Sequence, residues 1–123
     1  MVPVRVPETK ERKTPMHKTT ILFGYPKDST EFDRHYHEVH LPLTSKLKGI
    51  RGLTIGKLEA GDNGDKAPYY LITAIYTDSR EALDATLTTP EGQAVLKDVP
   101  NFATGGFTLL HDDEEVLIPL TLS

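Results

Sequence analysis

Three histidines lie close together in the segment Phe32–Leu43, which the sequence predicts to be helical. Imidazole is the side chain best suited to move protons near neutral pH, so this segment is the first candidate for chemistry. At ~3.6 residues per turn, one face of the helix carries an apolar stripe made of Phe32, Tyr36, Val39, Leu43 and Leu47. His40 lies about 40° beyond Tyr36, at the edge of this stripe. We therefore predict that His40 reaches a pocket beneath the helix.

The chemistry that this position predicts is general acid–base catalysis. A neutral imidazole at the edge of a pocket could take a proton next to a carbonyl, which contributes roughly 10²–10⁴-fold in rate. Tyr36, one turn before His40, could donate a hydrogen bond to a developing oxyanion, although its buried face also fits a core residue. We expect His35 and His37, which flank the stripe, to be solvated surface residues. His17 and His111 match no pattern of a site.

Two other interpretations of the helix histidines stay open. In the first, the role of His40 is structural, and its ring binds backbone carbonyls freed where Pro42 interrupts the helix. In the second, His37 and His40 share a divalent ion, because they are three residues apart. Asp33 is the only nearby helical candidate for a third ligand, and a good site also needs supporting contacts. We therefore predict neither a metal nor an organic cofactor.

The expected ligand is a small, largely apolar carbonyl or phenolic molecule. Beside His40 and Tyr36, we predict that the residues binding it are Phe23, Tyr25, Val39 and Leu43. Tyr25 ends the first predicted strand, where it could close the mouth of the pocket.

Composition limits the possible partners and compartments. The 123 residues support one domain with a hydrophobic core, and the net charge is −4. No stripe of Lys and Arg interleaved with aromatics is present, so we expect no nucleic acid partner. The absence of cysteine removes thiolate chemistry and fits a cytoplasmic protein. No apolar run approaches the ~20 residues of a membrane span, so no membrane partner is expected.

The chain divides into three parts. Residues 1–17 are rich in proline and charge without apolar periodicity, which predicts a flexible N-terminal arm. This arm either wraps a partner subunit or is a leader before a natural start at Met16. Residues 18–111 form the predicted domain. In 112–123, we expect Asp112–Glu115 to be a solvated turn and Val116–Leu122 to pack within the subunit or across a dimer.

The predicted elements of the domain have the order β-α-β-β-α-β. Strands are expected at 19–25, 50–58, 69–77 and 102–111. A helix capped by Asp28 is expected to begin near Ser29 and to kink or break at Leu41, before Pro42. After the third strand, a helix capped by Asp78 or Ser79 runs to about Leu87, and a second helix, capped by Thr89, begins at Pro90 and stops before Pro100. This order predicts an α+β, ferredoxin-like domain with a four-stranded antiparallel sheet.

Two of the strands carry apolar side chains on both faces. In the third strand, Ile72 and Tyr76 lie on one face, and Leu71 and Ile75 lie on the other. In the first strand, Leu22 lies on the face opposite to Ile21 and Phe23. Helices on one side of a sheet cover only one face, and an open apolar face would aggregate. We therefore predict a homodimer in which two subunits pack sheet on sheet.

Several segments together resemble the EthD family, within the dimeric α/β-barrel superfamily. The similarity is most specific in the helix Phe32–Leu43, where aromatic pairs precede a His-x-Pro-Leu ending. It extends from about Lys18 to His111 and includes Ile21–Tyr25 with Pro26, Gly49–Gly52, Tyr69–Tyr76 and Asp78–Leu83. The resemblance implies a ferredoxin-like subunit that pairs through its sheets into a barrel.

The resemblance also implies a functional context. The EthD family is named for an association with the degradation of an alkyl ether by an oxygenase system, so the implied label is oxidoreductase or an accessory of one. Similar barrels include cofactor-free monooxygenases, cyclases, isomerases and decarboxylases, and several place a histidine of the first helix in a pocket. The matching residue here is His40. The alternative is a non-catalytic protein that holds a small molecule or supports a degradation pathway.

Overall fold

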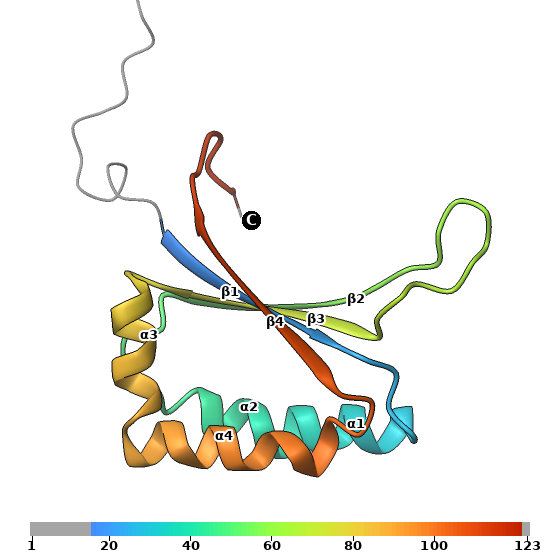
Figure 1. Cartoon of the computed structure of the whole chain (residues 1–123), viewed down its shortest axis with the longest axis horizontal. Helices are drawn as coiled ribbons and strands as arrows, with labels where there is room; N and C mark the ends of the chain where they lie inside the picture. The colour runs from blue at the N-terminus through green and yellow to red at the C-terminus, as the bar shows by residue number, and fades with distance from the viewer. Residues whose placement is uncertain (1–15, 122–123) are drawn as a thin grey trace, which may run out of the picture.

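The computed structural model describes residues 16–121, which fold into one antiparallel sheet with helices on one side (Figure 1). The strands are β1 (Met16–Phe23), β2 (Gly52–Lys57), β3 (Leu71–Thr77) and β4 (Phe107–Glu114). The helical segments are α1 (Ser29–His35), the π-helical turn η2 (Tyr36–His40), α2 (Leu41–Thr44), α3 (Arg80–Leu87) and α4 (Pro90–Phe102). The predictions for residues 1–15 lie outside the described residues.

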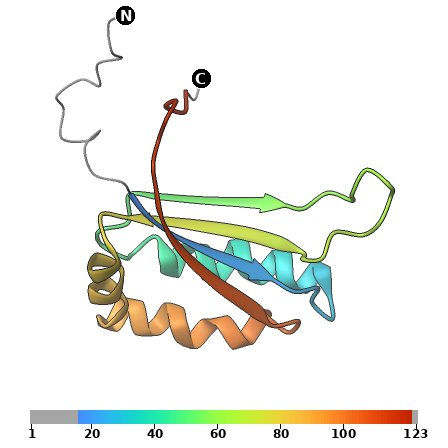
Figure 2. The same ribbon diagram turned by 45° about the horizontal axis from the view of Figure 1, so that its top comes forward.

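The sheet has the strand order β2-β3-β1-β4, and each neighbouring pair is antiparallel. The helices form a single layer against one face of this sheet (Figure 2). This arrangement confirms the predicted α+β, ferredoxin-like class. None of the helices in residues 16–121 has the length and apolar character needed to cross a membrane.

The helices begin at the predicted capping residues. Asp28 accepts a hydrogen bond from the backbone N–H of Glu31, and Ser79 caps α3 in the same way. Thr89 caps α4, which has Pro90 at its first position. The predicted end of this last helix before Pro100 is wrong, because α4 continues to Phe102.

Burial explains why α4 continues past its internal proline. Pro100 lacks one backbone hydrogen bond donor, but it lies on the exposed face of the helix. Two residues further on, Phe102 packs into the aromatic core against Phe23, Phe32 and Tyr36. Burying a side chain of this size offsets the lost backbone hydrogen bond.

Strand β4 begins and ends later in the chain than predicted, at Phe107 and Glu114, and the predicted turn at Asp112–Glu115 is wrong for its first three residues. Within β4, Asp112 pairs with Lys18, and Asp113 pairs with His17. The ammonium of Lys18 donates to a Glu114 carboxylate oxygen at 2.8 Å. These opposite charges across two strands stabilise the sheet beyond the predicted domain boundary at His111.

The apolar segment that follows β4, from Val116 onward, does not pack against the rest of the described subunit. Leu117, Ile118 and Leu120 are 77%, 87% and 86% exposed. The part of the prediction that placed this tail within its own subunit is therefore wrong. No helix or strand formed by residues 16–121 covers these side chains, since the segment extends away from the sheet (Figure 2).

Candidate functional site

The candidate site begins at an irregularity in the first helical segment. The N–H of Leu41 donates to the carbonyl of Tyr36, five residues earlier, which defines the π-helical turn η2. An irregularity is thus present before Pro42, where a kink or a break was expected, and it takes the form of a π turn through which the helix continues into α2. Such turns insert one extra residue into a helix and occur frequently at functional sites.

The extra residue changes which side chains face the sheet. Tyr36, the first residue of the turn, is buried as predicted, and His40, its last residue, and Thr44 in α2 are buried too, with exposed fractions of 6% and 5%. Val39 and Leu43 are only half-buried and do not line the cavity under the sheet. The prediction that they bind the ligand is therefore not supported by their position, because it assumed an unbroken 3.6-residue period.

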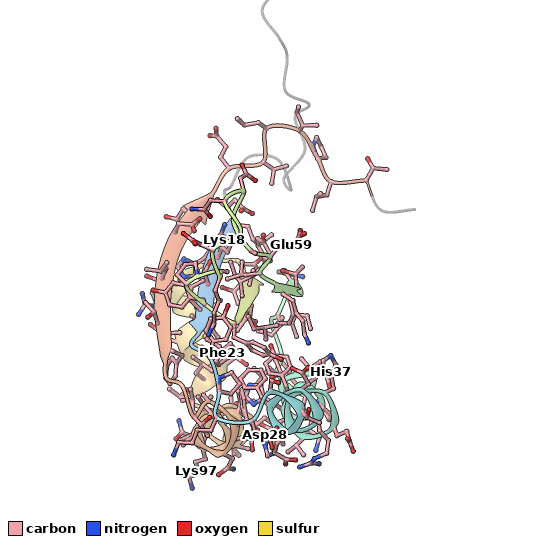
Figure 3. The ribbon with its side chains drawn as sticks, turned by 90° about the vertical axis from the view of Figure 1, so that its right-hand side faces the viewer. Lys18, Phe23, Asp28, His37, Glu59 and Lys97 are labelled. Carbon is pink, nitrogen blue, oxygen red and sulfur yellow. The ribbon has the colours of Figure 1, made fainter. Side chains whose placement is uncertain are left out.

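A cavity of about 270 Å³ lies between the helices and the inner face of the sheet. His40, Tyr36 and Phe23 line it, as predicted, and Figure 3 shows Phe23 between the sheet and the helical layer. The rest of the wall is mostly apolar and includes Ile21, Leu53, Ile75, Leu83, Val95 and Leu109. A cavity of this kind suits a small hydrophobic molecule.

A buried carboxylate from α4 orients His40. His40 Nδ1 donates to Asp98 Oδ2 at 2.9 Å, and His35 Nε2 donates to Asp98 Oδ1 at 2.8 Å. The amide of Asn101 donates to the same Oδ1 at 3.1 Å. Asp98, which is only 6% exposed, therefore holds two histidines of the first helical region at once.

The predictions for the histidines are corrected by this arrangement. His35 is not a solvated surface residue, because its ring packs on Phe102 and binds Asp98. The structural interpretation of His40 expected backbone carbonyls as partners of its ring, and the observed partner is a carboxylate. No pattern in the sequence indicates Asp98, which lies 58 residues after His40 in the chain.

The local environment favours a neutral imidazole beside an ionised carboxylate. Burial lowers the pKa of His40 below its ordinary value, and the nearby Asp98 only partly opposes this effect. Burial alone would raise the pKa of Asp98, but hydrogen bonds from its three neighbours outweigh it and lower the pKa. At neutral pH, His40 thus has its proton on Nδ1 and a lone pair on Nε2.

Tyr36 contributes the second polar group at this end of the cavity. Its side chain is 2% exposed, and its hydroxyl is 2.7 Å from Thr73 Oγ1 on β3. Burial raises the pKa of the Tyr36 hydroxyl, so it stays protonated at neutral pH. The Tyr36 and His40 ring centroids are 5.5 Å apart. Tyr36 thus belongs both to the core and to the cavity wall.

Tyr25 lies outside the cavity, contrary to its predicted position at the mouth. Its hydroxyl donates to the carbonyl of Ala67 at 2.9 Å, and the ammonium of Lys66 lies over its ring. Both partners belong to the loop between β2 and β3. Tyr25 therefore fastens this loop to the end of β1.

The residues of the metal interpretation do not converge. His37 is exposed and directed away from the sheet, with its Nδ1 donating to the Asp33 carbonyl (Figure 3). The Asp33 carboxylate binds Tyr70 and Lys57, each at 2.7 Å. Within residues 16–121, no three His, Asp or Glu side chains are grouped in a way that could hold a metal ion.

A second pair of histidines lies between the first and last strands. His17 Nε2 and Thr19 Oγ1 are each 3.2 Å from His111 Nδ1, and the two imidazole rings stack. Thr19 and His111 line the cavity, together with Arg80 and Asp84 of α3. This group cannot be recognised from residue spacing, because 94 residues separate the two histidines and only the strand register joins them.

Comparison with known proteins identifies the family. The EthD domain model matches residues 25–106. An uncharacterized 11.0 kDa protein from the thcB–thcC intergenic region of Rhodococcus erythropolis is 35% identical over 104 residues, which are 85% of this chain and 100% of the relative.

Solved structures give the same result. An EthD-family protein of Bacillus halodurans has 34% identity and a TM-score of 0.74, over 80% of this chain and 98% of its own. A hydroxynitrile lyase of Passiflora edulis shares the fold, with 13% identity and a TM-score of 0.66 over 85% of this chain and 99% of its own. With the family match and the two relatives above 30% identity, the chain belongs to the EthD family.

Proposed function

We propose that this protein is an enzyme without a bound organic cofactor, in which His40 acts as a general acid or base on a small hydrophobic metabolite. The observation that carries the proposal is the hydrogen bond from His40 Nδ1 to the buried Asp98. It fixes the tautomer that leaves a lone pair on Nε2, in a ring that lines an apolar cavity. Within the described residues, Nε2 has no hydrogen bond partner.

Tyr36 supports the same chemistry from a position beside His40 at the same end of the cavity. Its protonated hydroxyl can accept a hydrogen bond from Thr73 and donate its own proton toward a ligand oxygen. When His40 removes a proton next to a carbonyl, negative charge grows on the carbonyl oxygen, and a hydroxyl donor stabilises it. The resulting enolate is shared by isomerases, decarboxylases and cyclases, as well as by cofactor-free oxygenation. The family resemblance favours an oxidoreductase or its accessory.

The decisive experiment is metabolite profiling of the purified protein, with two histidine variants compared. His40→Ala removes the proposed base, whereas His37→Ala removes an exposed histidine of the same turn that does not line the cavity. We expect a transformation that persists in His37→Ala and falls by at least about 100-fold in His40→Ala. A transformation that continues undiminished in His40→Ala contradicts the proposal.

The second candidate function is binding without catalysis, in support of a degradation pathway. The observation that favours it is the largely apolar wall, which would hold a hydrophobic molecule without any proton transfer. In this case, the profiling experiment recovers a bound metabolite unchanged, and His40→Ala alters its affinity but produces no change in turnover.

We further propose that the protein is a homodimer that packs through the outer face of its sheet. Leu22 pairs with Ile72, and Thr20 pairs with Leu110, so these side chains share the face opposite the helices. No helix of the described chain covers this face (Figure 1). Proteins of the same fold from Bacteroides fragilis and Thermobifida fusca are described as dimeric.

Light scattering tests the dimer directly. A lysine at position 110 would bury a charge between the two sheets, so we expect Leu110→Lys to be monomeric. The control is Glu38→Lys, which adds positive charge on the exposed surface of the helical layer and should leave the dimer intact. A wild-type protein that is monomeric at micromolar concentration contradicts the proposal.

A further inference from the structure

The cavity has polar groups at two separate places. The deep group consists of His40, Tyr36 and Thr73, all of which are buried. The mouth group consists of Thr19, His111, Arg80 and Asp84. The Arg80 and Asp84 side chains are 52% and 60% exposed, which places this second group where the cavity meets solvent. The wall between the two groups is apolar.

Strand register gives the distance between the groups. Thr73, the hydroxyl partner of Tyr36, lies opposite Ile21 on β1, and His111 lies opposite Thr19 on the other side of the same strand. Two residues along a strand correspond to about 7 Å, and β1 separates β3 from β4 by two strand spacings of about 4.8 Å each, so the two groups lie roughly 12 Å apart. One small molecule is therefore long enough to reach both groups, and a cavity of about 270 Å³ has room for it.

The hydrogen bonds of the mouth group leave one side of His111 available. Thr19 and His17 both contact Nδ1, so Nε2 is the ring atom that can bind a ligand. Burial, with Arg80 and His17 nearby, lowers the pKa of His111, and the ring is neutral at neutral pH. A neutral ring whose Nδ1 accepts from Thr19 or His17 has its proton on Nε2, where it is a hydrogen bond donor.

The charges at the mouth favour an uncharged ligand group. Arg80 Nε lies 3.3 Å from Asp84 Oδ1, so a carboxylate already balances the one arginine that, among residues 16–121, lines the cavity. A ligand carboxylate would be attracted by the positive charge of Arg80 and repelled by the negative charge of Asp84. A hydroxyl can both accept from His111 and donate to Asp84, and it meets no repulsion.

We propose that the cavity selects an elongated molecule with oxygen at both ends, a carbonyl at His40 and an uncharged hydroxyl at His111. This inference rests on the proposed function, because it assumes that a ligand occupies the cavity beside His40. Thr19 and His111 are then specificity-determining residues that recognise the hydroxyl. They lie on strands β1 and β4, away from the helices that carry His40 and Asp98.

Two aryl ketones that differ by one group test the proposal. The probes are 4-(4-hydroxyphenyl)butan-2-one and 4-phenylbutan-2-one, and titration calorimetry with the full chain gives their dissociation constants. We expect the wild type to bind the hydroxylated probe about fivefold more tightly, the effect of one hydrogen bond near solvent. In His111→Phe and Thr19→Val, the preference should fall to less than about twofold.

Controls separate this inference from the proposed function. Thr20→Val changes the neighbouring residue of β1 on the opposite face and should retain the preference. If the wild type binds both probes equally, or if both mouth variants retain the preference, the inference is wrong, while the proposed function stands. If the wild type binds neither probe, the ligand-filled cavity itself is contradicted and both proposals fail. Tighter binding of the matching benzoate, 4-(3-oxobutyl)benzoate, would overturn the choice of an uncharged group.

Discussion

The two pairs of histidines in this molecule are held in different ways. His35 and His40 are joined through one buried carboxylate, Asp98, whose two oxygens accept from the two rings at 2.8 and 2.9 Å. His17 and His111 instead contact each other directly, and the nearest carboxylate, Asp113, is 3.4 Å from His17 and 77% exposed. A shared buried carboxylate fixes the tautomer of each ring, whereas a histidine that contacts another histidine can exchange donor and acceptor roles.

This difference suits the proposed roles of the two pairs. Proton transfer requires a ring whose lone pair is always directed at the ligand, and a fixed carboxylate partner provides this. Recognition of a hydroxyl, which both donates and accepts, tolerates a ring in either tautomer. The network of His35, His40 and Asp98 has shorter hydrogen bonds than the pair His17 and His111, and it lies beside the closed end of the cavity.

Removing the two aspartates gives the largest expected contrast. Asp98→Ala leaves three donors without their acceptor, among them the buried His40 and the half-buried His35, so we expect the free energy of unfolding to fall by about 3 kcal/mol. Asp113→Ala removes an exposed carboxylate with one long contact, and we expect a change below about 0.5 kcal/mol. Urea denaturation followed by circular dichroism measures both. Equal losses of the free energy of unfolding in the two variants would mean that the carboxylates stabilise the two histidine pairs to the same extent.

The sequence predicted most of this fold for local reasons. Capping residues such as Ser79 and Thr89, apolar periodicity and turn chemistry act within a few neighbouring residues, and they located the helices and the order of the strands. Strand β4 was misjudged because Asp112–Glu114 is too acidic to look like a strand. Its pairing depends on Lys18, almost a hundred residues away.

The site was harder to predict because its geometry depends on contacts distant in sequence. The sequence indicated His40 and Tyr36 from their place on a helical wheel. It could not indicate the π turn that directs His40, rather than Val39, toward the sheet. Nor could it indicate Asp98, which reaches His40 only when α4 packs beside the first helical region. Spacing within one helix predicts which residues share a face, and tertiary packing decides what that face meets.

The pH dependence of stability is the second test of the comparison. The folded-state pKa values of Asp98 and His40 both lie below their ordinary values. As pH falls, the unfolded chain therefore binds protons first, His40 from about pH 6.5 and Asp98 from about pH 4. We expect the free energy of unfolding to decrease between pH 7 and pH 4.

Two variants assign this decrease to one pair or the other. His40→Gln removes the buried group, so the loss between pH 6.5 and pH 5 should become smaller. His111→Phe removes an imidazole whose pKa is also lowered but which is exposed. We therefore expect His111→Phe to change the pH dependence of the free energy of unfolding less than His40→Gln does. The measurement is urea denaturation at each pH. A flatter profile in His111→Phe than in His40→Gln would reverse the proposed difference between the pairs.

The smallest expected effect concerns the hydroxyl beside the second pair. Thr19 is buried, and its Oγ1 lies 3.2 Å from His111 Nδ1, so Thr19→Val removes one hydrogen bond at nearly constant volume. We expect a loss of about 1 kcal/mol in the free energy of unfolding, well below that of Asp98→Ala. Thr20→Val, one residue further on the opposite face, is the matched control and should cost less, because among the described residues its hydroxyl has no hydrogen bond partner. If Thr19→Val costs no more than Thr20→Val, the hydroxyl does not hold the His111 ring, and the second pair is positioned by stacking and strand register alone.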